Sequence, residues 1–303
     1  MIKKTLYFGN PAYLSISNKQ LLIETKNEIR EGDRKSSIPI EDIGLVVADH
    51  AQVTFTHSVI TSLQENNAVV VWCGQNHLPV SMSLPLSSND TYTEKVRMQV
   101  EATEPLKKQL WRQTVSAKIK NQAALLRKIG QPSIQLDWMV NRVNSGDPEN
   151  YEGQAAAIYW SKILTTYGVK RGREEPYPNH LFNYGYAILR AIIARNLVGS
   201  GCLPVLGIHH SNKYNAYCLA DDIMEPYRPI VDMLVIEYLK KKNPINDEMT
   251  KEEKVYLLQI PVIDICIEKK WSPLMVGAQR TTASLVKCYQ GSARKILYPE
   301  ILS

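Results

Sequence analysis

Hydrophobic and polar positions follow two different patterns along this chain. Before about residue 84, short runs of β-branched and aromatic residues alternate with turn residues, which is typical of β-strands. A helix is expected within this series, near His57–Glu65. Many short strands at close spacing predict a small sandwich or two packed sheets. The predicted strands are Lys3–Phe8, Tyr13–Ser17, Gln20–Thr25, Ser36–Ile40, Ile43–Ala48, Ala68–Trp72 and Pro79–Met82.

Two of these predicted strands carry a further expectation. Ile43–Ala48 and Ala68–Trp72 are almost entirely apolar, so both of their faces should be covered. A sheet domain of about 84 residues cannot cover many such faces by itself. We therefore expect a second copy of the chain to pair with it.

After about residue 90 the apolar positions recur at helical spacing. The sequence predicts an α+β protein, with an N-terminal β-sandwich-like domain at residues 1–84, a linker at 85–89 and a mainly α-helical domain at 90–303. The predicted helices are Leu106–Ile129, Asn150–Tyr167, Leu181–Val198, Asp222–Lys241 and Lys251–Ile265.

Composition excludes several classes of protein. The five cysteines include no CxxC pair and are odd in number, which excludes a zinc ribbon and argues against a disulfide scaffold. No apolar run approaches membrane-spanning length, and no signal-peptide core follows the basic start, so we expect no membrane and a reducing cytoplasm. The net charge of +6 permits a polyanionic partner without establishing one.

The candidate chemistry begins in a polar loop. His209 and His210 lie in it, and Asp221, Asp222 and Glu225 follow at the start of a predicted helix. Asp222 and Glu225 are three residues apart, so they share one helical face. Carboxylates at a helix start are also favoured by the helix dipole, which is a purely structural alternative. Together with histidine, however, they indicate a site for a hard cation such as Mg²⁺ or Mn²⁺.

A second segment supplies another carboxylate. Glu152 lies one turn into a predicted helix and precedes Gly153 and three alanines, small residues that let a ligand or a helix approach closely. The alternative is a packed helix start with Glu152 exposed. Glu149 is the competing acid, and its position before the helix favours solvent.

The helix Leu106–Ile129 is basic. No acidic residue lies between Leu106 and Lys128, which favours contact with a DNA backbone over a merely solvated face. Tyr184 and Tyr186 are candidates to stack on bases, with core packing as the alternative. The candidate DNA-binding cations are Lys107, Lys108, Arg112, Lys118 and Lys120, and a second basic cluster is Lys162, Lys170, Arg171 and Arg173.

In order and spacing, these segments resemble the CRISPR-associated integrase of spacer acquisition, the first-numbered and near-universal Cas protein, in a type II variant. The resemblance spans essentially the whole chain. The motifs that carry it are Asn150-Tyr151-Glu152-Gly153, Asn183-Tyr184-Gly185-Tyr186, Gly207-x-x-His210 and Asp222-x-x-Glu225-Pro226.

The resemblance implies roles for particular residues. It makes Glu152, His210 and Glu225 the catalytic metal ligands, because the spacing after the loop glycine matches His210 rather than His209. Asp222 would be a supporting acid. Arg228 would hold Glu225 or Asp222 in place, or form a purely structural ion pair. Such a ligand set favours Mg²⁺ or Mn²⁺ over zinc.

The resemblance also implies an activity and an assembly. The activity is metal-dependent joining of the 3′-OH ends of short double-stranded DNA fragments to CRISPR repeat DNA by transesterification, with an associated DNA endonuclease activity. The assembly is a homodimer built through the β domains, with two dimers bridged by the small second-numbered Cas protein. Two alternatives remain open: a stand-alone, structure-specific DNase in DNA repair, and a non-catalytic DNA-binding scaffold.

Overall fold

A computed structural model describes residues 3–25, 34–86, 89–167, 178–241 and 249–302. Residues 87 and 88 of the predicted linker, and Lys170, Arg171 and Arg173 of the second basic cluster, lie outside the described residues. The chain divides into two compact units, Met1–Asn89 and Asp90–Ser303.

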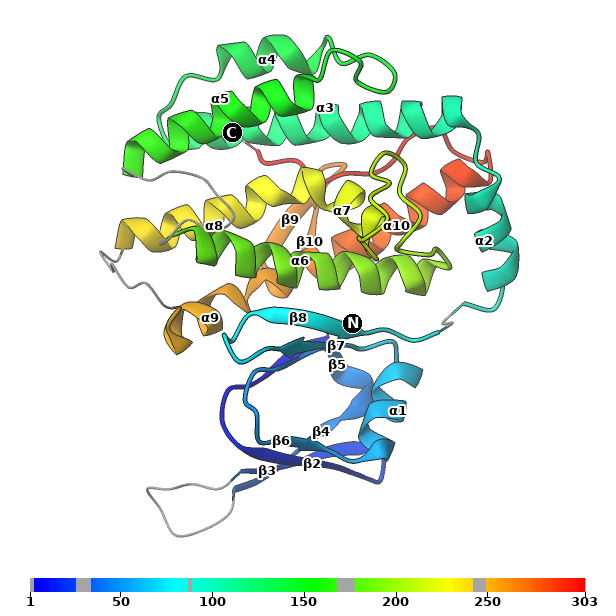
Figure 1. Cartoon of the computed structure of the whole chain (residues 1–303), viewed down its shortest axis with the longest axis vertical. Coiled ribbons are helices and arrows are strands. Elements are labelled where there is room, and N and C mark those ends of the chain that lie inside the picture. Colours follow the sequence, from blue (N-terminus) through cyan, green and yellow to red (C-terminus); the bar gives the residue numbers. More distant parts are fainter. Residues whose placement is uncertain (1–2, 26–33, 87–88, 168–177, 242–248, 303) are drawn as a thin grey trace. The chain divides into compact units, whose positions relative to one another are not determined.

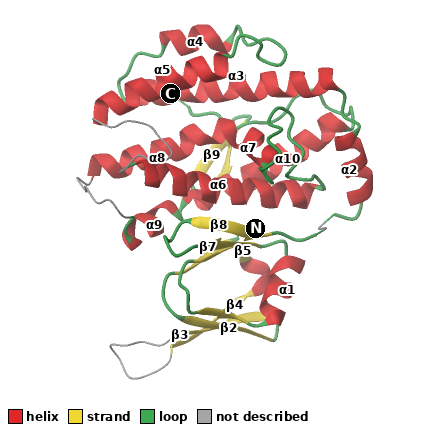
Figure 2. Ribbon diagram, viewed as in Figure 1, coloured by secondary structure: helices red, strands yellow, loops and turns green. Residues whose placement is uncertain are grey.

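The first unit contains two four-stranded sheets and a helix, α1 (His57–Glu65) (Figure 2). One sheet has the order β1-β5-β7-β8, in which only the edge strand β8 is antiparallel to its neighbour. The other has the order β4-β3-β2-β6, and its β2 and β6 are parallel. The strands are β1 (Lys4–Phe8), β2 (Ala12–Ser17), β3 (Gln20–Thr25), β4 (Arg34–Pro39), β5 (Ile43–Ala48), β6 (Val53–Phe55), β7 (Val69–Cys73) and β8 (Pro79–Ser83), and Ile40–Asp42 forms a short 3-10 turn, η1.

The two sheets and α1 share one hydrophobic core. Leu14 and Leu21 come from one sheet, Val46 and Val70 from the other, and Leu63 from α1. The predicted packing of two sheets is therefore confirmed. The three-residue strand β6 was not predicted, because it is too short to show a period of two.

The apolar strands that led us to expect a second copy are buried. All six residues of β5 are buried, and so are the first three residues of β7. Val46 of β5 and Val70 of β7 lie in the core that the two sheets share. Pairing with a second copy stays a prediction.

The second unit is mostly helical and contains one short hairpin (Figure 1). Its helices are α2 (Tyr92–Val100), α3 (Glu104–Lys128), α4 (Ile134–Val140), α5 (Tyr151–Tyr167), α6 (Asn179–Ser200), α7 (Cys218–Met224), α8 (Arg228–Lys241), α9 (Lys251–Leu257) and α10 (Leu274–Tyr289). Two 3-10 turns, η2 (Glu225–Tyr227) and η3 (Ile260–Val262), and the strands β9 (Asp264–Ile267) and β10 (Lys270–Pro273) complete it.

Two predicted helices are divided or shortened in the structure. The predicted helix Asp222–Lys241 is broken into α7, η2 and α8, because Pro226 and Pro229 lack the N–H groups that a continuous helix requires. The predicted helix Lys251–Ile265 ends at Leu257 and is followed by η3 and the hairpin. The helices α2, α4 and α10 were not predicted. The buried residues of α10 include Gly277 and Ala278 as well as Leu274 and Leu285.

The long helix α3 positions the candidate site. It packs against α4, α5, η2 and α8. The C-terminal segment is also attached to it, since the Gln113 side chain donates to the Arg294 carbonyl and accepts from the Ile296 N–H, at 3.0 and 2.9 Å. Further along, Asn121 donates to the carbonyls of Pro226 and Pro299, at 2.7 and 2.9 Å. These bonds tie η2 and the C-terminal segment to one helix. Among the described residues, no helix is both long and apolar enough to cross a membrane.

Candidate active site

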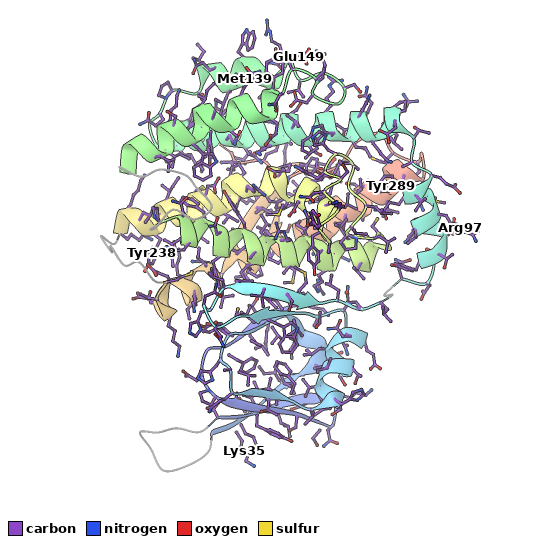
Figure 3. The ribbon with its side chains drawn as sticks, viewed as in Figure 1. Lys35, Arg97, Met139, Glu149, Tyr238 and Tyr289 are labelled. Carbon is purple, nitrogen blue, oxygen red and sulfur yellow. The ribbon has the colours of Figure 1, made fainter. Side chains whose placement is uncertain are left out.

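Glu152 is held by the residue that caps its helix. The Asp147 carboxylate accepts the backbone N–H groups of Tyr151 and Glu152, each at 2.9 Å, at the start of α5. Glu149 is exposed and accepts a hydrogen bond from the Asn144 side chain at 3.0 Å, and Figure 3 labels it in this loop. Of the two acids in this segment, Glu152 is thus the one fixed by the helix start. The cap was missed, although an aspartate before a helix is a recognisable signal.

Asp222 organises the histidine loop. Its fully buried carboxylate accepts the backbone N–H groups of Ile208, His209 and His210, at 2.7, 3.0 and 3.3 Å. It also hydrogen-bonds to Nδ1 of the His210 ring at 2.5 Å. A Cβ atom at Gly207 would lie 2.3 Å from the His210 carbonyl oxygen, so only glycine permits this turn.

The two rings of the histidine doublet have different surroundings. His209 stacks on Trp111, with ring centroids 4.1 Å apart and planes only 1° from parallel, and burial lowers its pKa. The hydrogen bond that the His210 ring donates to the Asp222 carboxylate raises the pKa of His210. Because that bond uses Nδ1, the other ring nitrogen of His210 is the one directed away from Asp222. A carboxylate that orients an imidazole in this way is common behind metal ligands.

Lys118 joins the two other predicted ligands. Its side chain is buried, its ammonium hydrogen-bonds to Glu152, and Nζ lies 2.5 Å from Oε2 of Glu225. Burial by itself would lower the pKa of Lys118, but Glu225 and Glu152 outweigh it and raise that pKa. The carboxylates of α5 and η2 thus converge on one cation, which α3 supplies.

Glu225 is the most enclosed of the predicted ligands. Burial would raise its pKa, but Arg228 and Lys118 reverse this effect and hold the pKa below its ordinary value. Nε of Arg228 lies 3.3 Å from Oε1 of Glu225, and the charge of His210 also acts on this carboxylate. Of the two partners considered for Arg228, Glu225 is therefore the one that it contacts. Asp222 is engaged by the loop instead.

The donors of this site suit a hard divalent cation. Two carboxylates already bracket one positive charge, the Lys118 ammonium, and His210 acts electrostatically on Glu225. Among the described residues, no three His, Cys, Asp or Glu side chains form a ready metal cluster. Oxygen ligands with one imidazole and no thiolate fit Mg²⁺ or Mn²⁺.

A cleft opens beside His210. It has a volume of about 370 Å³ and is lined by Lys107, His210, Asn212 and Lys213, among others. Lys107 also pairs with Glu104 at 3.1 Å. Lys213 was missed as a candidate, although it lies three residues after His210 in the sequence.

Three residues predicted to contact DNA do not face solvent. Lys118 is 5% exposed and paired with the two carboxylates. Tyr184 is fully buried. Tyr186 is also buried, and its hydroxyl group donates a hydrogen bond to the Asp232 carboxylate. Tyr159 donates to the same carboxylate at 2.7 Å. The prediction that both tyrosines stack on bases is therefore wrong, since their rings are part of the core.

The other predicted cations of α3 lie at the surface. Lys108, Arg112 and Lys120 are exposed, and Lys120 pairs with Glu300 at 3.0 Å. An acid distant in sequence thus neutralises part of the positive charge of α3, although α3 has no acid of its own between Leu106 and Lys128. Arg112 and Lys120 border a second cleft of about 570 Å³, which we call the basic cleft. Its charged lining residues are Arg112, Lys120, Glu268, Lys269, Arg294, Lys295 and Glu300.

A known protein family matches most of this chain. The profile of the family described as "CRISPR associated protein Cas1" matches residues 6–269. A CRISPR-associated endonuclease Cas1 from Neisseria meningitidis serogroup C (strain 8013) is 32% identical over 306 residues, covering 100% of this chain and 97% of the relative. The chain belongs to the Cas1 family.

Solved structures share its fold. A casposase bound to integration product superposes with a TM-score of 0.79 at 18% identity, covering 98% of this chain and 92% of the casposase. A Cas6-RT-Cas1–Cas2 complex gives a TM-score of 0.73 at 19% identity, covering all of this chain and 36% of the longer one. At these identities the likeness establishes the α+β fold alone.

Proposed function

We propose that this Cas1-family chain is a metal-dependent DNA integrase of CRISPR adaptation, with an associated DNA endonuclease activity. It joins the 3′-OH ends of short double-stranded fragments to CRISPR repeat DNA by transesterification. The observation that carries the proposal is the convergence of Glu152 and Glu225 on one cation, beside an imidazole oriented by Asp222. The endonuclease name of the Neisseria relative and the integration product bound to the casposase support it.

Each residue has a distinct part in this chemistry. Glu152, Glu225 and His210 would hold Mg²⁺ or Mn²⁺, which supplies a lowered hydroxyl pKa and neutralises charge on the phosphate. Asp222 keeps the His210 ring and its loop in one orientation. Arg228 keeps Glu225 ionised and in place. No covalent protein nucleophile is needed, because the attacking group is the 3′-hydroxyl of DNA, or water in the nuclease reaction.

The DNA and protein partners belong to the same proposal. Lys107 lies in the cleft beside His210, while Lys108, Arg112 and Lys120 offer exposed charge for DNA phosphates. We further propose a homodimer, two of which are bridged by the small second-numbered Cas protein, and the Cas1–Cas2 complex of shared fold supports this. We also propose that the chain is a type II variant and that it acts in the cytoplasm of a prokaryotic cell. In this proposal the β domain forms the dimer and the helical domain carries out catalysis. All five cysteines are free thiols, as a reducing compartment would require.

Isosteric substitutions test the function. Glu152→Gln, His210→Asn and Glu225→Gln should each abolish joining of a labelled 3′-OH fragment into a plasmid that carries a CRISPR repeat, and should abolish nuclease activity equally. Glu149→Gln, at the exposed acid of the same loop, is the matched control and should keep both activities. EDTA should silence the protein, and Mg²⁺ or Mn²⁺ should restore it.

The outcomes separate the alternatives. A protein that cuts DNA but never joins it would be a stand-alone DNase. A protein that binds DNA with no activity in any metal would be a scaffold. Joining that survives either exhaustive EDTA or the Glu152→Gln change would refute the metal site.

A further inference from the structure

We propose that Lys118 is a built-in counter-cation of the active site. In the metal-free protein its ammonium holds Glu152 and Glu225 in place, and it leaves this position when a divalent ion enters. The proposal rests on the proposed function, because it concerns the same pair of carboxylates. It assigns Lys118 as a positioning residue, a role that a basic helix alone does not suggest.

The three charged groups are enclosed by the protein. The side chains of Lys118 and Glu225 are only 7% and 6% exposed, and that of Glu152 is 28% exposed. Carboxylates removed from water and set side by side repel one another unless a cation pairs with them. Lys118 contacts both, so it removes the repulsion that would otherwise spread the site.

The charges around Glu225 balance without a metal ion. Glu152 and Glu225 carry two negative charges, and Lys118 and Arg228 carry two positive charges, so this cluster is neutral without any metal. Adding a divalent ion while Lys118 stays would leave two uncompensated positive charges in a poorly solvated site. Their mutual repulsion is strong at contact distance in such surroundings. The ion and the ammonium therefore compete for the same oxygens.

The three groups come from three separate elements. Lys118 lies on α3, Glu152 on α5 and Glu225 on η2. A flexible lysine stem allows the ammonium to swing out without moving its helix, and the more exposed Glu152 marks the open side. Lys118 thus keeps the two carboxylates in place before the metal binds. A metal ion must displace the ammonium to bind, so Lys118 lowers the metal affinity of the site.

The test measures Mn²⁺ binding by titration calorimetry and thermal unfolding with and without Mn²⁺, on the full-length protein. In Lys118→Gln and Lys118→Met we expect a lower melting temperature without metal, at least about tenfold tighter Mn²⁺ binding, and a larger rise in melting temperature on adding Mn²⁺. Lys128→Gln, at an exposed position of the same helix, is the control and should match the wild type in all three.

Each result decides the matter. Variants that bind Mn²⁺ with wild-type or weaker affinity overturn the proposal while leaving the metal site intact. If neither wild type nor variants bind Mn²⁺, the proposed function fails, and this inference fails with it. If the variants fold only when Mn²⁺ is present, the ion has replaced the ammonium, as the proposal requires. Variants that stay unfolded even in Mn²⁺ contradict it, because another cation should then suffice.

Discussion

Removing the Asp222 carboxylate should destabilise the histidine loop, whose backbone it holds. Asp222→Ala leaves three backbone N–H groups and the Nδ1 atom of His210 without their acceptor. Ile208 is buried, so its N–H cannot turn to water, whereas His209 and His210 are exposed and their N–H groups can.

The magnitude follows from that difference. An unpaired buried N–H costs about 1–3 kcal/mol, and the two groups that water can reach cost less, so the total should be about 2–4 kcal/mol. For a helical unit of this size that corresponds to a fall in melting temperature of roughly 4–15 °C. Asp222→Asn keeps the shape and one acceptor oxygen, so it should cost about half as much.

Two assays together distinguish positioning from folding. Thermal unfolding in EDTA gives the stability loss, and strand joining in Mn²⁺ gives the functional loss. Because Asp222 orients His210, Asp222→Asn should lower joining by about 10–100-fold at temperatures where the variant is fully folded. Glu149→Ala is the control for loss of an acid. Wild-type stability and wild-type joining in Asp222→Ala would refute this reading of the loop.

Three further outcomes are expected. Tyr186→Phe removes the hydrogen bond to Asp232, so it should lower the melting temperature by a few degrees. It should leave DNA affinity unchanged. Weaker DNA binding by the folded variant would mean that Tyr186 contacts DNA. Four cations of the basic cleft can be neutralised together, as Arg112→Gln, Lys269→Gln, Arg294→Gln and Lys295→Gln. This variant should bind any DNA duplex more weakly, and the slope of log affinity against log salt concentration should become shallower by up to about 3–4. An unchanged slope, measured by fluorescence anisotropy, would exclude this surface from DNA contact. Sedimentation of the purified chain should give a dimer, and a monomer at micromolar concentration would contradict the predicted homodimer.

Much of the local structure was readable from the sequence. The strand β5 and the helices α1 and α3 agree with prediction to within a few residues, because period-two and helical apolar patterns are strong where strands and helices are regular. The acids and histidines were also readable as candidates, since their residue types and spacing are visible without a structure. The failures are the helix that prolines divide, at Pro226, and the helices α2, α4 and α10, which were not predicted.

The basic helix α3 shows what sequence could not determine. Its cations look alike in the sequence, and none has an acidic neighbour between Leu106 and Lys128. In the structure Lys118 is buried between Glu152 and Glu225, while Lys120 faces outward and pairs with Glu300. Two residues along a helix turn the side chain by about 200°, so neighbouring lysines meet entirely different surroundings.

Pairing of this kind is decided only when distant segments meet. Residue type and local period depend only on neighbours within a few positions. From these two features the sequence predicted the two-sheet domain, the helices, and the candidate histidines and acids. The partner of a buried charge depends instead on which helices pack together, because only a packed interior removes the water that would otherwise solvate it. For this reason tertiary structure alone placed Lys118 between two carboxylates, buried Tyr184 and Tyr186, and gave Asp222 the backbone of the histidine loop to hold.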